Sequence, residues 1–480
     1  MNYEIIIGLE VHVQLSTATK AFCGCSTSFE SSPNENICPV CCGYPGVLPV
    51  FNQRALQLAL RVCLALNCRV NQRIYFERKN YFYPDLPKNY QISQYKLPLG
   101  EDGFMTVPPG KKVWIQRVHI EEDAGKLIHK QGYSLIDLNR TGIPLLEIVT
   151  LPDINSPQEA FSYLNFLKLT LQYIDVSSCD MEKGYLRCDA NISLKEKGEK
   201  ALGTKVELKN MNSFRGVRDA LEYESRRQAA CLERKQPIIQ ETRLWDEAEK
   251  KSVVMRVKEE AHDYRYFPEP DLADFVVDKA MIENEKKSIE ELPLDKYERF
   301  RKEYGLRDGG LSDGEINTLI SNKWLANFFE ASVKEAKGDF KNVANWILGP
   351  FLEITNSFGG DYSMVYITPT RFAKIVSYFV EGKINNLAAK RVLAICLKDG
   401  GGVDAVIERE GLSQVSSHDG LYSYIDEAVS QNPEAVSDFL QGKRQAVMFL
   451  VGQVMKKSKG KANPKVAKEL LEARLKNQAK

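Results

Sequence analysis

Acidic side chains recur at positions where the sequence predicts the polar face of a β-strand. In residues 3–16 (YEIIIGLEVHVQLS), apolar residues take every second position, a period that predicts an extended strand with one buried face. The other face then presents Glu10, His12 and Gln14 in a row. A carboxylate and an imidazole two residues apart on that face can reach one cation or phosphate. A solvated strand face is the alternative for this segment alone.

Later segments with strand periodicity also carry acidic residues on their polar faces. These acids are Glu121 or Glu122, Glu147, Asp189 and Glu207. If the strands share one sheet the carboxylates converge, and repulsion between like charges makes an uncompensated cluster costly. Mg²⁺ would relieve this repulsion, because proteins usually hold it with a few carboxylates together with water and substrate phosphates.

The chain lacks the glycine-rich loops that commonly hold nucleotides. It contains neither a G-x-x-x-x-G-K-[ST] loop nor a G-x-G-x-x-G turn. Any nucleotide is therefore expected to bind through a metal ion and through basic residues such as Lys79, Lys205 and Arg187.

Four cysteines follow the first predicted strand in a pattern typical of a zinc site. Cys23 and Cys25 form a C-x-C pair, and Cys38 and Cys41 form a C-x-x-C pair after a gap of twelve residues. Paired knuckles of this kind hold one tetrahedral zinc, and because four protein ligands leave no open position, the site would be structural. Four structural thiols are the alternative, and the neighbouring Cys42 is not expected to be a ligand.

The elements that would position these groups are short strands, helices and two aromatic loops. A helix is predicted over residues 52–67, and a capping box with proline at the first helical position predicts another from Ser156 to about Asp175. The segments 78–95 and 262–272 are broken by prolines and rich in aromatic residues. Such aromatics suit a loop that lines a wet cavity, although a surface loop pinned by aromatics is the alternative.

The strand pattern stops near Pro293. Helices with apolar three-to-four spacing are predicted from residue 295 to about 397, and a glycine-rich joint at 399–402 precedes a small helical bundle. From Gln441 to Lys480 there are eleven Lys and Arg against Glu469 and Glu472, a net charge of +9 that leaves −8 for the rest of a chain of net charge +1. This basic tail suits a polyanion such as RNA, and a solvated helical tail is the alternative.

Bulk composition describes an ordinary soluble globular protein. Of the 480 residues, 27% are charged and 43% are hydrophobic, and no apolar run approaches the ~20 residues that span a bilayer. The first strand begins at once, so no leader peptide is expected, and cytoplasm is the expected location. There, eleven cysteines indicate thiols or a metal site and not a disulfide framework.

Eight motifs together carry a resemblance to one family. In chain order they are LEVHVQL, the C-x-C and C-x-x-C pairs, KNYFYPDLPKNYQISQY, HIEEDAGK, DLNRTGIPLLEIVT, LRCDANIS, KVELKNMNSF and EEAHDYRYFPEPDL. The chain resembles the B subunits of glutamine-dependent aspartyl/glutamyl-tRNA amidotransferases. Near the end, FLVGQVMKKSKGKANPK is similar to the family's tRNA-binding tail, which is related to small YqeY-type domains.

The resemblance implies an α+β fold. The expected parts are a glutamine synthetase-like antiparallel-sheet cradle over residues 1–292 with zinc knuckles at 23–41, an all-α domain over 293–400 and a helical basic tRNA-binding tail over 401–480. It also implies a carbon–nitrogen ligase that uses ATP, Mg²⁺ and a structural Zn²⁺. ATP phosphorylates the side-chain carboxylate of Glu-tRNA(Gln) or Asp-tRNA(Asn), and ammonia displaces the phosphate. An amidase A subunit supplies the ammonia, and a small C subunit completes a heterotrimer.

The resemblance also implies roles for individual residues. The catalytic and Mg²⁺-binding residues would be Glu10, His12, Glu122, Glu147, Asp189 and Glu207. Strand alternation favours Glu121 over Glu122, so that choice stays open. Lys79 and Lys88 would line the route of ammonia, and the tRNA-binding residues would be Lys443, Arg444, Lys456, Lys457, Lys459 and Lys461. The rival functions are a zinc-containing RNA-binding factor without catalysis and a free-standing ammonia-using ligase for a small molecule.

Overall fold

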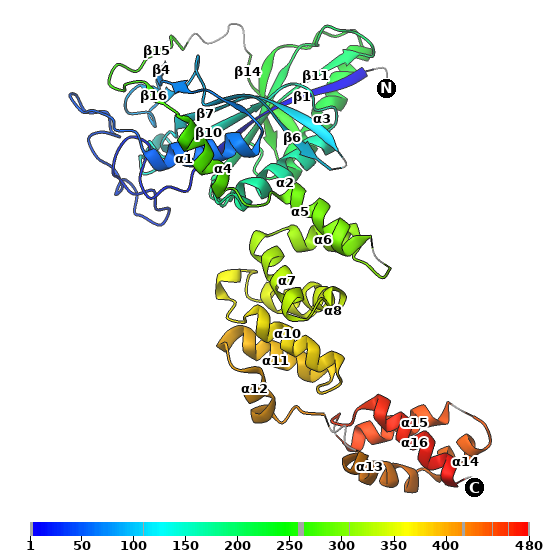
Figure 1. Cartoon of the computed structure of the whole chain (residues 1–480). Coiled ribbons are helices and arrows are strands. Elements are labelled where there is room, and N and C mark those ends of the chain that lie inside the picture. Colours follow the sequence, from blue (N-terminus) through cyan, green and yellow to red (C-terminus); the bar gives the residue numbers. More distant parts are fainter. Residues whose placement is uncertain are drawn as a thin grey trace. The chain divides into compact units, whose positions relative to one another are not determined.

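The computed structural model describes residues 3–108, 110–257, 264–306, 308–414, 418–443, 445–458 and 460–478. The chain divides into two compact units, Met1–Lys296 and Tyr297–Lys480. The first unit holds the strands and the second is helical, so the mixed α+β class predicted from the sequence is confirmed (Figure 1). Among the described residues, no helix is long and apolar enough to cross a membrane.

A nine-stranded sheet forms the centre of the first unit. Its strand order is β14-β13-β12-β11-β1-β10-β7-β6-β2. The strands are β1 (Tyr3–Gln14), β2 (Arg69–Val70), β6 (Gly100–Val107), β7 (Lys111–Glu122), β10 (Pro144–Thr150), β11 (Leu186–Glu196), β12 (Val206–Lys209), β13 (Glu241–Asp246) and β14 (Lys251–Val257). Neighbouring strands are antiparallel except β12 and β13, which are parallel. The first strand of the chain is therefore the middle strand of the sheet.

Three helices cover the apolar face of this sheet. They are α1 (Gln53–Ala65), α2 (Pro157–Tyr173) and α3 (Phe214–Glu233), and their apolar residues share one core with Ile7, Leu9 and Val11 of β1 (Figure 1). The first two start at a polar cap: the side chain of Asn52 accepts from the second and third amides of α1, and Ser156 accepts from the amide of Glu159 in α2. The polar face of β1 is left on the other side of the sheet.

Smaller elements surround the polar face. The segment 78–95, predicted as one aromatic loop, instead contains the antiparallel strands β4 (Glu77–Asn80) and β5 (Tyr90–Ser93), with β15 (Phe267–Pro268) pairing with β4. A hairpin is formed by β8 (Lys126–Lys130) and β9 (Tyr133–Asp137). Two further short strands, β3 (Arg73–Ile74) and β16 (Phe275–Val276), pair with each other. Residues 262 and 263 of the second predicted aromatic loop lie outside the described residues.

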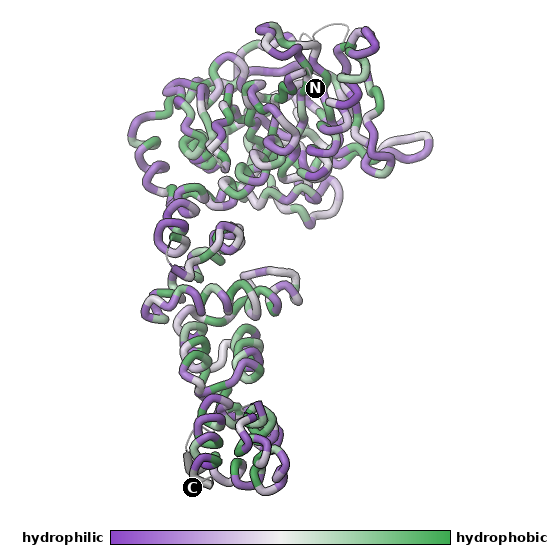
Figure 2. The backbone as a smooth tube through the Cα atoms, turned by 90° about the vertical axis from the view of Figure 1, so that its right-hand side faces the viewer, coloured by the Kyte–Doolittle hydropathy of each residue, from purple (hydrophilic) through white to green (hydrophobic). Residues whose placement is uncertain are grey.

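The remaining helices are α4 (Lys279–Ser288), which packs against the core of the first unit through Met281 and Ile282, and a series that forms two further cores. The helices of this series are α5 (Pro293–Phe300), α6 (Asp313–Ile320), α7 (Lys323–Glu335), α8 (Phe340–Trp346), α9 (Leu352–Asn356), α10 (Pro369–Val380), α11 (Asn386–Asp399), α12 (Val403–Glu410), α13 (His418–Ser430), α14 (Pro433–Leu440), α15 (Ala446–Lys457) and α16 (Pro464–Gln478), with short helical turns at Arg301–Gly305, Ile347–Phe351 and Tyr362–Met364. One core runs from Phe300 to Ile407, and a separate one begins at Leu421. Hydrophobic and hydrophilic residues alternate along the backbone of these helices (Figure 2). The helical core thus extends past the expected boundary at residue 400, because Val403, Val406 and Ile407 of α12 pack into it.

Candidate functional site

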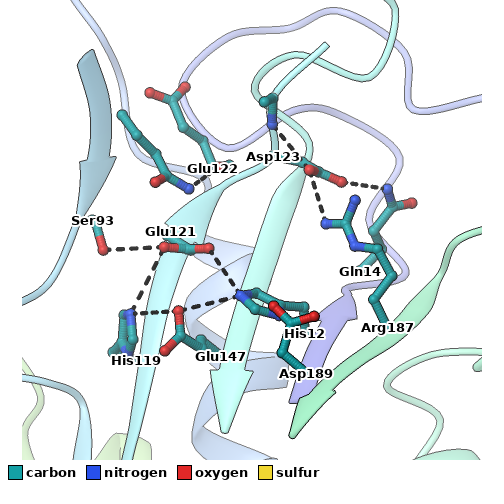
Figure 3. A network of polar contacts seen from close by, with 12 residues as sticks. His12, Gln14, Ser93, His119, Glu121, Glu122, Asp123, Glu147, Arg187 and Asp189 are labelled. Carbon is teal, nitrogen blue, oxygen red and sulfur yellow. Dashed lines mark hydrogen bonds and ion pairs between the residues drawn. The ribbon is translucent and has the colours of Figure 1, made fainter. Parts of the chain in front are cut away.

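The acids expected on strand faces meet on the polar face at the middle of the sheet (Figure 3). His12 of β1 lies opposite Glu147 of β10 on one side and opposite Arg187 of β11 on the other. Glu10, one pleat further along β1, lies opposite Asp189. Because strand neighbours in register have adjacent side chains, this pairing gathers residues far apart in the sequence into one site.

One group of possible metal ligands consists of His12, Glu121 and Glu147, whose ligand atoms all lie within 4.8 Å of one another. His12 Nε2 is 3.3 Å from Glu147 Oε2 and 3.8 Å from Glu121 Oε1. His119 completes the surroundings, with its Nε2 3.5 Å from Glu147 Oε2 (Figure 3). The contact of His119 with Glu147 follows from the pairing of β7 with β10, in which the two residues lie opposite each other.

A second group consists of Glu10, Asp189 and Glu207, again with ligand atoms within 4.8 Å of one another. Asn191 Nδ2 donates to Glu10 Oε1 at 3.2 Å, and Thr242 Oγ1 donates to Glu207 Oε2 at 2.7 Å. Each group offers oxygen or imidazole ligands on the polar face, which suits a divalent cation such as Mg²⁺.

Burial and charge perturb the titration of these groups. Burial raises the pKa of the Glu10 carboxyl, and the negative charges of Glu147 and Asp189 raise it further. Burial alone lowers the pKa of His12, but the hydrogen bond to Glu147 and the charges of Glu147 and Glu121 raise it above its usual value. A bound cation would compensate the carboxylates that produce both shifts.

Glu122, unlike Glu121, lies apart from the other acids. It forms an ion pair with Lys88, and its Oε1 accepts a hydrogen bond of 2.8 Å from the backbone amide of Ile92. Successive residues of a strand point to opposite faces, so β7 cannot present both acids to the same site. Of the two alternatives, the structure brings Glu121 to His12 and Glu147.

The two lysines expected on an ammonia route lie beside acids or aromatic rings. Lys79 Nζ is 5.2 Å from the centre of the Tyr264 ring. Burial lowers the pKa of Lys79, but the charges of Glu121, Tyr266 and Glu147 outweigh burial and raise it. Lys88 is paired with Glu122. Both lysines therefore lie close to the carboxylates of β7.

Asp123 is the centre of an ion-pair network that the sequence did not indicate. Arg187 Nη2 donates to its Oδ1 at 2.9 Å, Gln14 Nε2 donates to its Oδ2 at 2.8 Å, and Arg140 Nε lies 3.6 Å from Oδ2 (Figure 3). Burial raises the pKa of Asp123, but Arg187 and Arg140 outweigh it, so the pKa lies below its usual value. Arg187, expected as a phosphate-binding residue, is thus held by a carboxylate at the edge of the site.

A cavity of about 480 Å³ adjoins the second group of acids. Its lining includes Glu10, Gln116, Asn191, Thr204, Lys205 and Gln240. Lys205 is exposed, as a residue that meets a phosphate from solution must be. The carboxylate of Glu10 at one wall and amides, hydroxyls and an ammonium at the others suit a polar, phosphate-bearing ligand.

The four cysteines form the third group, with all their Sγ atoms within 4.8 Å of one another. Hydrogen bonding with Cys23 lowers the pKa of the Cys41 thiol to about 4 despite burial, and the charge of Lys20 acts in the same direction. Four convergent sulfur ligands at this spacing fit tetrahedral zinc. Cys42 is not a member of this group.

The basic residues expected to bind tRNA lie on and around α15. Lys456 and Lys461 are exposed, whereas Lys443 pairs with Asp438 at 2.8 Å and Lys457 with Glu427 at 2.6 Å. Arg444 and Lys459 lie outside the described residues.

Comparison with known proteins matches both units. Residues 5–283 match the family described as GatB/GatE catalytic domain, and residues 327–475 match that described as GatB domain. A protein from Thermodesulfovibrio yellowstonii, named as the B subunit of aspartyl/glutamyl-tRNA(Asn/Gln) amidotransferase, is 48% identical over 475 residues, which cover 98% of this chain and 99% of that protein. Proteins of the same name from Carboxydothermus hydrogenoformans (46% over 482 residues; 99% and 99%) and Moorella thermoacetica (47% over 484 residues; 99% and 100%) are also similar over their full lengths.

Proposed function

Because the chain belongs to the family of aspartyl/glutamyl-tRNA(Asn/Gln) amidotransferase B subunits, we propose that it performs the ATP-dependent step in the transamidation of misacylated tRNA. ATP phosphorylates the side-chain carboxylate of glutamate on tRNA(Gln), of aspartate on tRNA(Asn), or of both. The nitrogen of ammonia then attacks the acyl phosphate and inorganic phosphate leaves, which yields the amide. A carboxylate needs this activation because oxide is a poor leaving group.

The observation that carries the proposal is the pair of ligand groups on one sheet face beside a polar cavity. Glu10, Asp189 and Glu207 would hold one Mg²⁺, and His12, Glu121 and Glu147 a second. Bound there, the ions would neutralise charge on phosphate oxygens. In phosphoryl transfer the protein mainly positions the reactants and neutralises the charge of the phosphate, and this arrangement would do both.

Other residues of the chain would bind and orient the reactants. Lys205, on the wall of the cavity that Glu10 also lines, would pair with a phosphate of ATP. We assign the ammonia route to Lys79 and Lys88, since both lie beside carboxylates of β7 and could hydrogen bond an incoming amine. On this assignment Glu122 contributes to the ammonia route through its ion pair with Lys88, and Glu121 is a ligand of the metal ion.

The surrounding assembly follows from the same proposal. The first unit would be a glutamine synthetase-like cradle with a structural Zn²⁺ on Cys23, Cys25, Cys38 and Cys41, and the end of the chain a YqeY-like tail that binds tRNA. An amidase A subunit and a small C subunit would complete a cytoplasmic heterotrimer.

The proposal can be tested with the assembled subunits, ATP labelled at the γ-phosphate, and Glu-tRNA(Gln). With glutamine withheld, hydroxylamine should trap an activated glutamyl group as the hydroxamate, and labelled phosphate should appear only when Glu-tRNA(Gln) is present. Correctly charged Gln-tRNA(Gln), which has no side-chain carboxylate, is the matched control. Binding of tRNA without any ATP turnover would instead indicate an RNA-binding factor, and turnover without tRNA would indicate a small-molecule ligase.

Removal of the basic tail should weaken tRNA binding more than it slows turnover. Truncation is best placed after Gln414, because α12 belongs to the preceding helical core and a cut near residue 402 would remove Val403 and Val406 from that core. The truncated protein should show a higher KM for tRNA and a flatter dependence of KM on salt, with kcat less affected.

Point substitutions give a finer version of this test. Replacing the exposed Lys456 and Lys461 by glutamine should lower the slope of log affinity against log salt by about 0.7–0.9 per lost phosphate contact. Lys457→Gln is the matched control, because Lys457 already pairs with Glu427 and should contribute less. An unchanged slope in the double variant would mean that these charges are only a solvated surface.

A further inference from the structure

Lys20 is one of the most deeply buried side chains of the first unit, with only 1% of its surface exposed. Its Nζ lies 3.6 Å from Cys41 Sγ and 3.3 Å from the carbonyl oxygen of Leu138. No carboxylate pairs with Lys20 within the part of the chain that the structure describes. Its nearest polar partners are therefore a zinc-ligand candidate and one backbone carbonyl.

A buried ammonium needs a compensating negative charge, because an unpaired charge is strongly disfavoured outside water even after the surroundings relax. Four thiolates around one Zn²⁺ carry a net negative charge, and the sulfur atoms accept hydrogen bonds from neighbouring donors. The four-cysteine site can thus supply the negative partner that Lys20 otherwise lacks.

We propose that Lys20 is the charge partner of the zinc–cysteine site and that it ties this site to the base of the β8–β9 hairpin. The inference rests on the zinc site proposed above and extends it to a residue outside the four ligands. Outer-shell partners of metal ligands commonly change metal affinity by about 10- to 100-fold when they are removed.

The loop between the two knuckles makes a second connection to the same hairpin. Asn34 Nδ2 donates to the carbonyl of Ile136 at 2.9 Å, and Asn34 Oδ1 accepts from the amide of Leu138 at 2.8 Å. Asn139 Nδ2 donates to the carbonyl of Ser32 at 2.7 Å. Asn34 adopts a left-handed conformation with φ of 61°, which asparagine tolerates better than most residues. Residues 136–139 therefore form hydrogen bonds both with the buried Lys20 and with the loop between the two knuckles.

The first experiment compares three full-length variants with the wild type. Zinc content is measured by elemental analysis, and zinc release is timed with excess chelator and a metallochromic dye. Lys20→Met, which keeps the length of the side chain and removes its charge, should release zinc about 10- to 100-fold faster. Lys126→Met, on the exposed part of the hairpin, should release zinc at the wild-type rate, and Cys38→Ser should retain little zinc.

Hydrogen exchange tests whether Lys20 ties the four-cysteine site to the base of the β8–β9 hairpin. In Lys20→Met, the amides of residues 32–36 and 136–139 should exchange faster, whereas those of β10 and β11 should not change. The Leu138 amide bonded to Asn34 is the most direct reporter.

If Lys20→Met does not fold, the amine reactivity of Lys20 in the wild-type protein tests the proposal instead. An amine-acetylating reagent followed by peptide mass spectrometry should leave Lys20 unmodified in zinc-loaded protein and modify it after chelation. Equal reactivity with and without zinc, or wild-type zinc release from Lys20→Met, would overturn the role of Lys20. Wild-type protein that contains no zinc would instead overturn the zinc site itself.

Discussion

Replacing Asp189 by asparagine should lower the rate of ATP-dependent transamidation by about 10²- to 10³-fold at saturating ATP and Mg²⁺. Asparagine keeps the size of the side chain but removes one of the three negative charges that Glu10, Asp189 and Glu207 bring within 4.8 Å of one another. With fewer anionic ligands, the site loses much of its affinity for a divalent cation. Glutamine hydrolysis should persist, because the proposed function assigns that chemistry to a partner subunit.

The control for this prediction is Glu4→Gln, a charge-removing change at the other end of β1, where Glu4 pairs with Lys195 at 3.0 Å. Its transamidation rate should equal that of the wild type. A second comparison separates the adjacent acids of β7: Glu121→Gln should raise the Mg²⁺ concentration needed for half-maximal rate, and Glu122→Gln should not. Wild-type turnover by Asp189→Asn would show that the metal site has been misplaced.

Replacing Asp123 by asparagine should destabilise the first unit by about 3 kcal/mol at neutral pH. Asp123 is only 3% exposed, and the change leaves the half-buried side chains of Arg187 and Arg140 without their carboxylate. The thermal transition of this unit should fall by about 6 °C, a shift that calorimetry measures directly.

The direction of the Asp123 pKa shift also predicts how the stability difference between the wild type and Asp123→Asn depends on pH. The pKa of Asp123 is lower in the folded protein than its usual value, so its stabilising contribution is full above the unfolded pKa of about 3.9 and is lost as pH falls through the folded pKa. The difference in the free energy of unfolding between the wild type and Asp123→Asn should therefore shrink as the pH is lowered. Asp153→Asn is the opposite case, because burial raises the pKa of Asp153, and this variant should not be destabilised at neutral pH. Equal stability of Asp123→Asn and the wild type at neutral pH would contradict the assigned role of the network.

Much of the candidate site could be predicted because strand periodicity assigns each residue to a face. The alternation in residues 3–16 predicts Glu10 and His12 on the polar side, and the same rule favours Glu121, although the family resemblance favours Glu122 and leaves the choice open. The cysteine spacing predicted the four-sulfur group in the same local way. The face of a strand on which a residue lies and the spacing of cysteines are properties of single segments, so they can be predicted without knowing how the segments pack.

The rest depends on which strands pair and in which register, and periodicity carries no such information. Asp189 could be placed on a polar face, but that it lies opposite Glu10 follows only from β11 pairing with β1. The ion pairs of Asp123 and the burial of Lys20 likewise arise from contacts between distant segments. The strands β4 and β5 were missed because prolines and aromatics around them resemble a loop, while their hydrogen bonds come from pairing with each other.

The central position of β1 has a consequence for synthesis of the protein on the ribosome. The neighbours of this strand are β10 (Pro144–Thr150) and β11 (Leu186–Glu196), so one of its edges stays unpaired until residue 150 has been made and the other until almost 200 residues have been made. At about 5–20 residues per second, this takes roughly 10–40 s. During that time a nascent chain exposes the apolar run of Ile5, Ile7 and Leu9, an aggregation-prone edge that ribosome-associated chaperones would be expected to cover. Translational pauses between residues 15 and 144 should therefore lower the soluble yield, whereas pauses beyond residue 209 should not.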